Sequence, residues 1–430
     1  MWPGAVVKSA ILRASGRPHI MLPLLIVVLV ACQGSSPAPV ISSPTSFVTP
    51  ISVPTGDVQE TVGNPPGPVL ALAPLPNGES LAGVGPVGDV DTGFEWQLFQ
   101  GHNDQWQPLA WPAEANPRSL SVSPSGDLIF AVPFSNAIFG PGQAWGLMRS
   151  YSGGDSWQQS LKGLRDPYVM DLAFSPAFDT DHTMFVVTWY SGVHFSTDAG
   201  ESWQLVPYRE EVQPSGGASP YDLALAVSPD YQGSPVESEP PAQGMIMASF
   251  ARRLHRWDRV DGVWRTVALT VTTPIKGLEP SQAQLTAGAI AFSPGFADDG
   301  TLYLYSGYAG LFRSTDRGGT WRSVNRRLPS PSPLITDFHL AVASATEVYV
   351  LLSGPRATSG ETVPGPGQRD RTLYRTRDAG ASWEALLDPP TLGDISAFAL
   401  TRDEEGQVIL HLGGSRGGVS SHATEALHWD

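Results

Sequence analysis

Three carboxylates recur in nearly identical surroundings, and carboxylates commonly serve enzymes as general acids, general bases or nucleophiles. Asp198 lies in STDAGESW, Asp316 in STDRGGTW and Asp378 in TRDAGASW. Each octapeptide follows the pattern Ser/Thr-x-Asp-x-Gly-x-Ser/Thr-Trp. Paired catalytic carboxylates in glycoside hydrolases act within about 10 Å of each other. The fold therefore decides whether these three side chains can do such chemistry.

Apolar runs typical of β-strands surround these octapeptides. Examples are TMFVVTW, TLYLYSG and QVILHLG, which are bounded by Gly, Pro and Asp. A Ser-Pro turn opens two closely related segments, AFSPAFDTDHT and AFSPGFADDGT. The 430 residues include 45 Gly and 40 Pro, and only 16% are charged. This composition favours turn-dense β structure over helices.

Tryptophans that end a related segment recur roughly every fifty to sixty residues, at Trp106, Trp157, Trp203, Trp264, Trp321 and Trp383. Four strands in a repeat of this length are typical of one propeller blade. We therefore predict an all-β fold, a β-propeller of about seven four-stranded blades over residues 68–430, with six or eight blades as alternatives. The last unit, 394–430, ends before a fourth strand. We expect a strand within residues 45–68 to complete it and close the ring.

In a propeller, each octapeptide belongs to a different blade and lies on the outer rim, tens of ångströms from the others. This separation favours a structural role for the carboxylates over a catalytic one. The Asp carboxylate can accept hydrogen bonds from backbone amides of the turn, Gly permits a positive φ, and Trp packs between strands. The residues predicted to build these turns are Ser196, Asp198, Gly200, Trp203, Ser314, Asp316, Gly318, Trp321, Thr376, Asp378, Gly380 and Trp383.

The octapeptide resembles the Asp-box, or bacterial neuraminidase repeat, of sialidases, sortilin-type receptors and photosystem II assembly factors. The resemblance implies the scaffold but not the sialidase site. Arg118, in NPRSLSV, lacks the Arg-Ile-Pro-like motif of sialidases, and no Tyr can be matched with a partnering Glu. We therefore favour a binding or assembly scaffold for a protein or glycan partner over an enzyme. The alternative is a sialidase-like or other glycoside hydrolase with a divergent active site.

Acidic residues stand near the start of several predicted inner strands, where a propeller has its channel mouth. They are Asp171, Asp222, Asp337 and Asp394, and Tyr168 and Tyr221 lie close to two of them in the sequence. Converging acids could bind a cation or a basic segment of a partner. Alternatively, they cap loops at the strand starts.

No metal site or cofactor site is predicted. The nine histidines show no H-x-x-x-H or H-x-H spacing, and no phosphate-binding or dinucleotide motif is present. Asp-rich DTDHT matches ADDGT in the related segment, which favours a turn over a calcium loop. The formal net charge of −15 argues against nucleic-acid binding.

The N-terminus is typical of an export signal. Basic residues precede the uncharged run IMLPLLIVVLVA, which is shorter than the roughly 20 residues of a membrane-spanning helix. The run ends at the sole cysteine, Cys32, in LVAC, which resembles a bacterial lipobox. We predict a lipoprotein signal peptide at 1–31, a lipidated Cys32, and a Pro/Ser-rich tether over 32–67. A monomer on the outer face of the cytoplasmic membrane, or elsewhere in the cell envelope, would then contact membrane only through its lipid.

Overall fold

The computed structural model describes the residues 63–89, 93–103, 105–112, 115–134, 146–206, 223–232, 244–250, 253–260, 263–265, 270–271, 287–307, 309–326, 328, 337–355, 369–386 and 392–429. The chain divides into a unit of Met1–Thr45 and a unit of Ser46–Asp430. The predicted signal peptide, Cys32 and most of the tether lie outside the described residues. Among the residues that are described, no helix has the length and apolar character needed to cross a membrane.

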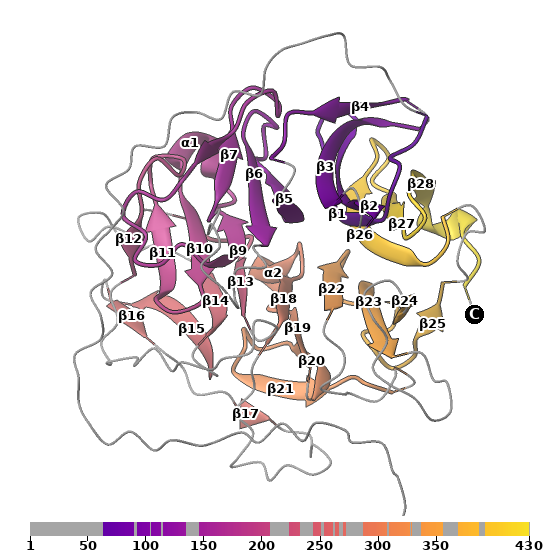
Figure 1. Cartoon of the computed structure of the whole chain (residues 1–430). Helices are drawn as coiled ribbons and strands as arrows, with labels where there is room; N and C mark the ends of the chain where they lie inside the picture. Colours follow the sequence, from indigo (N-terminus) through magenta and orange to yellow (C-terminus); the bar gives the residue numbers. More distant parts are fainter. Residues whose placement is uncertain are drawn as a thin grey trace, which may run out of the picture. The chain divides into compact units, whose positions relative to one another are not determined.

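The described strands of the second unit form seven sheets that follow one another along the chain and stand around a common centre (Figure 1). Within each sheet, every strand pairs antiparallel with the next one in the chain, apart from a short parallel addition to the fifth sheet. This arrangement is a seven-bladed β-propeller. The predicted fold class and blade number are confirmed.

Blades 1 to 4 each contain four strands, which in order from the centre outward are β1 (Val69–Pro74), β2 (Ser80–Asp89), β3 (Gly93–His102), β4 (Gln105–Leu109); β5 (Asn116–Val122), β6 (Ile129–Phe134), β7 (Met148–Ser150), β8 (Gln158–Gln159); β9 (Val169–Phe174), β10 (Met184–Thr188), β11 (Gly192–Ser196), β12 (Gln204–Leu205); β13 (Ala224–Val227), β14 (Met245–Phe250), β15 (Arg253–Val260), β16 (Val263–Arg265).

Blades 5 to 7 follow the same order, with β17 (Thr270–Val271) added beside β21: β18 (Ala289–Phe292), β19 (Leu302–Ser306), β20 (Gly310–Ser314), β21 (Thr320–Ser323); β22 (Asp337–Val342), β23 (Val348–Pro355), β24 (Arg369–Thr376), β25 (Glu384–Ala385); β26 (Ile395–Arg402), β27 (Val408–Gly414), β28 (Val419–Ala423). Among the described residues, the helical segments are α1 (Phe178–Asp181), α2 (Phe296–Asp299) and η3 (Thr424–Ala426).

Hydrophobic clusters join each blade to the next. One cluster combines Phe185 of β10 with Ile246 of β14, and another combines Phe130 of β6 with Trp203 beyond β11. Corresponding clusters fill the other interfaces, including the one between blades 7 and 1, which holds Ala397. Because every blade is covered on both faces, β10 and β19 are buried throughout, which accounts for their continuous apolar runs.

The ring closes where the innermost strands β26 and β1 contact each other. The Ser396 hydroxyl donates a hydrogen bond of 2.7 Å to the carbonyl of Val69, 327 residues away in the sequence. The backbone N–H of Gly418 also donates to the carbonyl of Pro65 at 3.3 Å. Blade 7 has three strands among the described residues. The strand expected within residues 45–68 to complete it is not present in residues 63–68, and residues 45–62 lie outside the described part.

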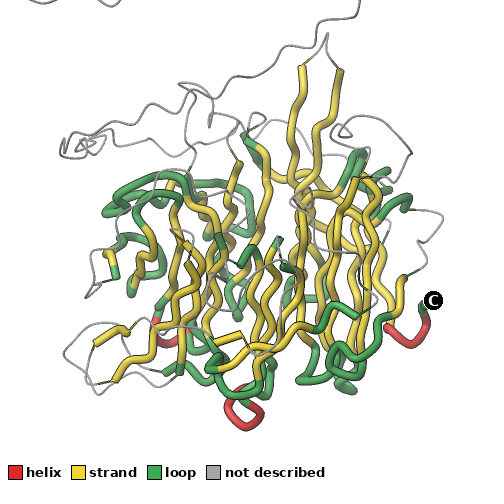
Figure 2. Tube along the Cα trace, turned by 90° about the horizontal axis from the view of Figure 1, so that it is seen from below, coloured by secondary structure: helices red, strands yellow, loops and turns green. Residues whose placement is uncertain are grey.

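Strand direction defines two faces of the ring. Seen edge-on, the strands run between the faces, and the helical segments lie toward one of them (Figure 2). We call the opposite face, where β9 and the other innermost strands begin, the mouth face. The β10–β11 turn reaches the mouth face too, because Thr188 pairs with Val169 at the start of β9.

Candidate binding surface on the mouth face

A buried carboxylate fixes the turn between β10 and β11. Asp166 is only 5% exposed. It accepts hydrogen bonds from the backbone N–H groups of Tyr168 (2.8 Å), Tyr190 (2.9 Å) and Ser191 (3.0 Å), and from the Ser191 hydroxyl (3.1 Å). A carboxylate taken out of water needs such donors, since an uncompensated buried charge is costly. The turn is therefore held rigidly to the loop before β9.

Three aromatic side chains lie together on this rigid turn. Trp189 and Tyr190 stack, with ring centroids 6.1 Å apart, and Tyr168 meets Tyr190 edge to face at 5.9 Å. Tyr190 is 48% exposed, whereas Tyr168 and Trp189 are half-buried. We call Tyr168, Trp189 and Tyr190 the aromatic cluster. Exposed, rigidly placed Tyr and Trp side chains are favoured at binding surfaces.

Three of the acids predicted at the mouth belong to the described residues, and these three lie near the starts of inner strands. Asp171 is the third residue of β9, Asp337 begins β22, and Asp394 immediately precedes β26. Tyr221 and Asp222 lie outside the described residues, and so does the side chain of Asp337. Convergence of all four acids on one ligand therefore stays a prediction.

Asp171 has a clear structural contact. Its carboxylate accepts a hydrogen bond from the backbone N–H of Leu172 (2.8 Å) and another from Leu225 of β13 (2.9 Å). The second bond ties the innermost strands of blades 3 and 4 together. This geometry supports the capping alternative for Asp171.

The predicted tryptophan turns share one hydrogen-bond pattern. In the turn of blade 3, the Ser196 hydroxyl donates to Asp198 (2.7 Å) and accepts from the Gly200 N–H (2.8 Å). Asp198 also accepts from the backbone (2.9 Å) and the hydroxyl (2.5 Å) of Ser202. The same contacts recur around Asp316 and Asp378, with distances between 2.6 and 2.9 Å. Each carboxylate thus closes its own turn, in a separate blade.

The hydroxyl contacts change the acidity of these carboxylates. Burial is the largest single influence and raises the pKa of Asp198 and Asp316. The several hydrogen bonds to each carboxylate, led by those from Ser202 and Thr320, together lower it by more, so both pKa values lie below the usual one. For Asp378 the Ser382 hydroxyl is the main cause of a lowered pKa. The turns therefore stabilise the ionised form of each carboxylate.

The blade 2 turn reaches the same geometry without a carboxylate. Ser152 replaces the Asp, and its hydroxyl accepts from the Ser156 N–H (3.0 Å) and contacts the Ser156 hydroxyl (3.0 Å). Ser150 keeps its bond from the Gly154 N–H at 2.9 Å. A hydroxyl can evidently replace the carboxylate, which supports a structural role for the position.

Each described turn tryptophan packs against the preceding blade. The Trp203 indole N–H donates to the Ser160 hydroxyl of blade 2 (2.9 Å), and that of Trp383 donates to the carbonyl of Val324 in blade 5 (3.0 Å). Trp106, Trp157 and Trp321 are at most 1% exposed. The side chain of Trp264 lies outside the described part. The indoles thus hold blades to one another.

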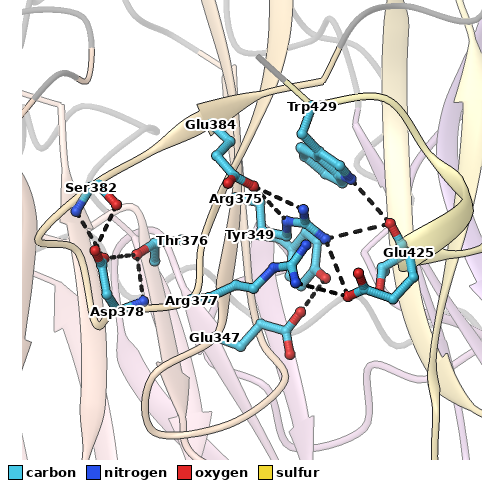
Figure 3. A network of polar contacts seen from close by, with 11 residues as sticks. Glu347, Tyr349, Arg375, Thr376, Arg377, Asp378, Ser382, Glu384, Glu425 and Trp429 are labelled. Carbon is cyan, nitrogen blue, oxygen red and sulfur yellow. Dashed lines mark hydrogen bonds and ion pairs between the residues drawn. The ribbon is translucent and has the colours of Figure 1, made fainter.

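An arginine clasp joins blade 6 to the C-terminal segment (Figure 3). Arg375 is 1% exposed, pairs with Glu384 at 2.8 Å, and lies 4.1 Å from the ring centre of Trp429. It also donates to the carbonyl of Thr424 at 3.4 Å. Arg377 forms a more exposed pair with Glu425 at 3.1 Å. Sequence analysis missed this clasp, because no local motif marks a contact between segments about fifty residues apart.

The Asp-rich turns have the structure expected of turns. Asp181 accepts from the Ser175 hydroxyl (2.7 Å) and the Thr183 N–H (2.8 Å), and Asp299 does the same with Ser293 and Thr301, both at 2.6 Å. Among the described residues, no group of three or more His, Cys, Asp or Glu side chains could hold a metal ion.

Comparison with known proteins gives only distant structural similarities; no family model and no curated protein matches the chain. YCF48 bound to D1 peptide aligns with 86% of this chain and 98% of its own, at 15% identity and a TM-score of 0.48. The extracellular domain of BT4673 from B. thetaiotaomicron aligns with 85% of this chain but 39% of its own, at 12% identity and a TM-score of 0.48. The GH74 enzyme of Niastella koreensis covers 82% of this chain and 65% of its own, at 14% identity and a TM-score of 0.33.

Proposed function

We propose that this chain is an extracytoplasmic binding propeller that presents its mouth face to a protein or glycan partner. A single observation carries the proposal: the aromatic cluster is both exposed at Tyr190 and fixed from beneath by four hydrogen bonds to Asp166. A binding surface that is already ordered loses little conformational entropy when a partner docks. The tryptophan turns, which we assign to the Asp-box type, would act only as scaffold.

The proposal places the protein on the outer side of a bacterial membrane, held through lipid on Cys32 after removal of residues 1–31. Two or three acyl chains anchor a protein stably, whereas one chain is marginal. A tether of about 30 residues at about 3.1 Å each could hold the propeller up to roughly 90 Å from the membrane. The Cys32→Ala protein should leave the membrane fraction, and its retention there would contradict the anchor.

The test of the binding role is affinity capture from solubilised membranes with the full-length protein and two variants. The mouth variant is Tyr168→Ala with Tyr190→Ala. The control is Tyr151→Ala, because Tyr151 is 52% exposed but lies away from the mouth face. It follows Ser150 of β7, which pairs with Ile129, and Ile129 in turn pairs with Val122 at the end of the innermost strand β5. We expect one set of partners to be recovered with wild type and control but lost with the mouth variant. Unchanged recovery in all three would show that the mouth face does not bind the partner, and no recovery with wild type would overturn the binding role.

A further inference from the structure

The side chains of the aromatic cluster favour one chemical class of ligand over others. The π-faces of Tyr and Trp attract cations, and Arg most of all, because the guanidinium group is both charged and planar. Tyr190 is one of two large hydrophobic side chains that are clearly exposed in the described part of the chain, and it stacks on Trp189. Its ring is therefore backed by a second ring and open to solvent on part of its surface.

The electrostatic surroundings favour a positively charged ligand. The whole chain has a formal net charge of −15, which raises the local concentration of basic segments near its surface. Close to the cluster, Asp166 lies beneath the turn and Asp171 lies on β9 of the same blade. Arg165 is exposed on the same loop, so the local sum of these three side chains is still negative. At long range, the net charge of the chain would repel a negatively charged ligand.

Resting on the proposed binding role, we propose that the aromatic cluster binds an Arg- or Lys-containing peptide segment of a partner protein. The cation would lie over the exposed part of the Tyr190 ring, with Trp189 and Tyr168 holding that ring in place. The rigid turn allows such contact without rearrangement, because Asp166 already fixes the backbone of Tyr190 and Ser191. Specificity would come from the rings, whereas the net charge would only accelerate encounter.

The test measures binding of three fluorescent probes to the full chain: the peptide Gly-Arg-Gly-Arg-Gly, its Glu counterpart Gly-Glu-Gly-Glu-Gly, and cellohexaose. Wild type is compared with Tyr190→Ala and Trp189→Ala, and with Tyr151→Ala as the matched control. None of these changes alters the net charge, so attraction by charge alone predicts equal affinities. We expect the Arg peptide to bind about three- to tenfold more weakly to the two cluster variants. Binding to Tyr151→Ala should match wild type, and the Glu peptide should not bind.

Two results would overturn the inference. One is equal affinity of the Arg peptide for wild type and Tyr190→Ala, which would mean attraction by net charge only. The other is Tyr190-dependent binding of cellohexaose without binding of the Arg peptide, which would assign the cluster to a glycan. Thermal unfolding of each variant shows whether a loss of binding reflects a loss of folding. If membrane partners are captured equally by wild type and Tyr190→Ala but are lost with the mouth variant Tyr168→Ala with Tyr190→Ala, this inference fails while the binding role survives.

Discussion

At the scale of single residues, the tryptophan turns show how much the sequence could reveal. The hydrogen-bonding Asp and the positive φ at Gly200, Gly318 and Gly380 follow from residue type. The left-handed conformation of the residue just before each Gly does not, since Ala199, Arg317 and Ala379 ordinarily avoid positive φ. The surrounding hydrogen bonds impose this conformation.

Substituting the turn glycines should reveal packing differences that the repeated motif hides. A Cβ at Gly380 would lie 2.6 Å from Cβ of Val324, whereas a Cβ at Gly318 would find its nearest neighbours at 3.6 Å or beyond. Both positions have positive φ, so Gly318→Ala measures the conformational cost alone, about 1 kcal/mol. Gly380→Ala should lose at least about 1 kcal/mol more in the free energy of unfolding. Equal losses in denaturant titrations would contradict this difference in packing.

The carboxylate of a turn should be replaceable by a hydroxyl, as in blade 2. Asp316→Ala leaves the Thr320 N–H and hydroxyl without their acceptor and should cost about 1–2 kcal/mol of stability at neutral pH. Asp316→Ser should cost clearly less, because Ser152 makes the corresponding contacts. The lowered pKa of Asp316 means that its contribution is present at neutral pH and is lost as the pH falls below about 4. A difference between wild type and Asp316→Ala that persists below that range would argue against this role for the carboxylate.

At the scale of elements, the strands and their order could be predicted, but the aromatic cluster could not. Periodicity and the repeated turns identify a blade, whereas Trp189 and Tyr190 read as the end of an apolar strand. Asp166 occurs in an ordinary loop sequence, and only the fold brings it beneath the β10–β11 turn. Tyr168 was identified because it stands just before an inner strand. A site that forms through contacts between separate segments leaves no pattern in the local sequence.

Blade 3 also contains a buried histidine on β11 that should make stability depend on pH. His194 is fully buried, and this burial lowers its pKa to about 4, so the folded state holds the neutral form. The unfolded chain takes up the proton below about pH 6.5, so stability should fall by at most about 3 kcal/mol as the pH drops from 6.5 towards 4. In His194→Gln this part of the pH dependence should disappear, whereas His182→Asn, on the surface turn after α1, should retain it. Identical pH profiles for wild type and His194→Gln would show that the imidazole does not resist protonation.

At the scale of the whole molecule, closure of the ring determines stability, because each blade needs a neighbour on both faces. The hydrophobic cluster between blades 7 and 1 and the bond from Ser396 to Val69 close the inner part. The arginine clasp secures the C-terminal segment against blade 6, where Leu386 also bridges to Trp429. Blade number could be predicted from the count of repeats. The closing contacts could not, because they join the two ends of the propeller sequence.

Removing the Trp429 indole that lies over Arg375 should destabilise the propeller more than removing a surface ion pair. Trp429→Ala takes away the cation–π contact and exposes a guanidinium group that is now buried, so a loss of about 2–3 kcal/mol is expected. Arg377→Ala breaks a pair whose side chains are 48% and 66% exposed and should cost less than about 0.5 kcal/mol. Chemical denaturation of both variants provides the comparison. A larger loss of stability for Arg377→Ala would mean that the contacts of Arg375 are not the ones that hold the C-terminal segment.

The turn carboxylates are expected to maintain the fold, while the mouth-face aromatics bind the partner. The most direct test measures the unfolding midpoint and the affinity for Gly-Arg-Gly-Arg-Gly on the same samples of Asp378→Ala and Tyr190→Ala. We predict a lower midpoint with unchanged affinity for Asp378→Ala, and weaker binding with an unchanged midpoint for Tyr190→Ala. Loss of binding in a fully folded Asp378→Ala protein, with Tyr190→Ala binding like wild type, would contradict this division of roles.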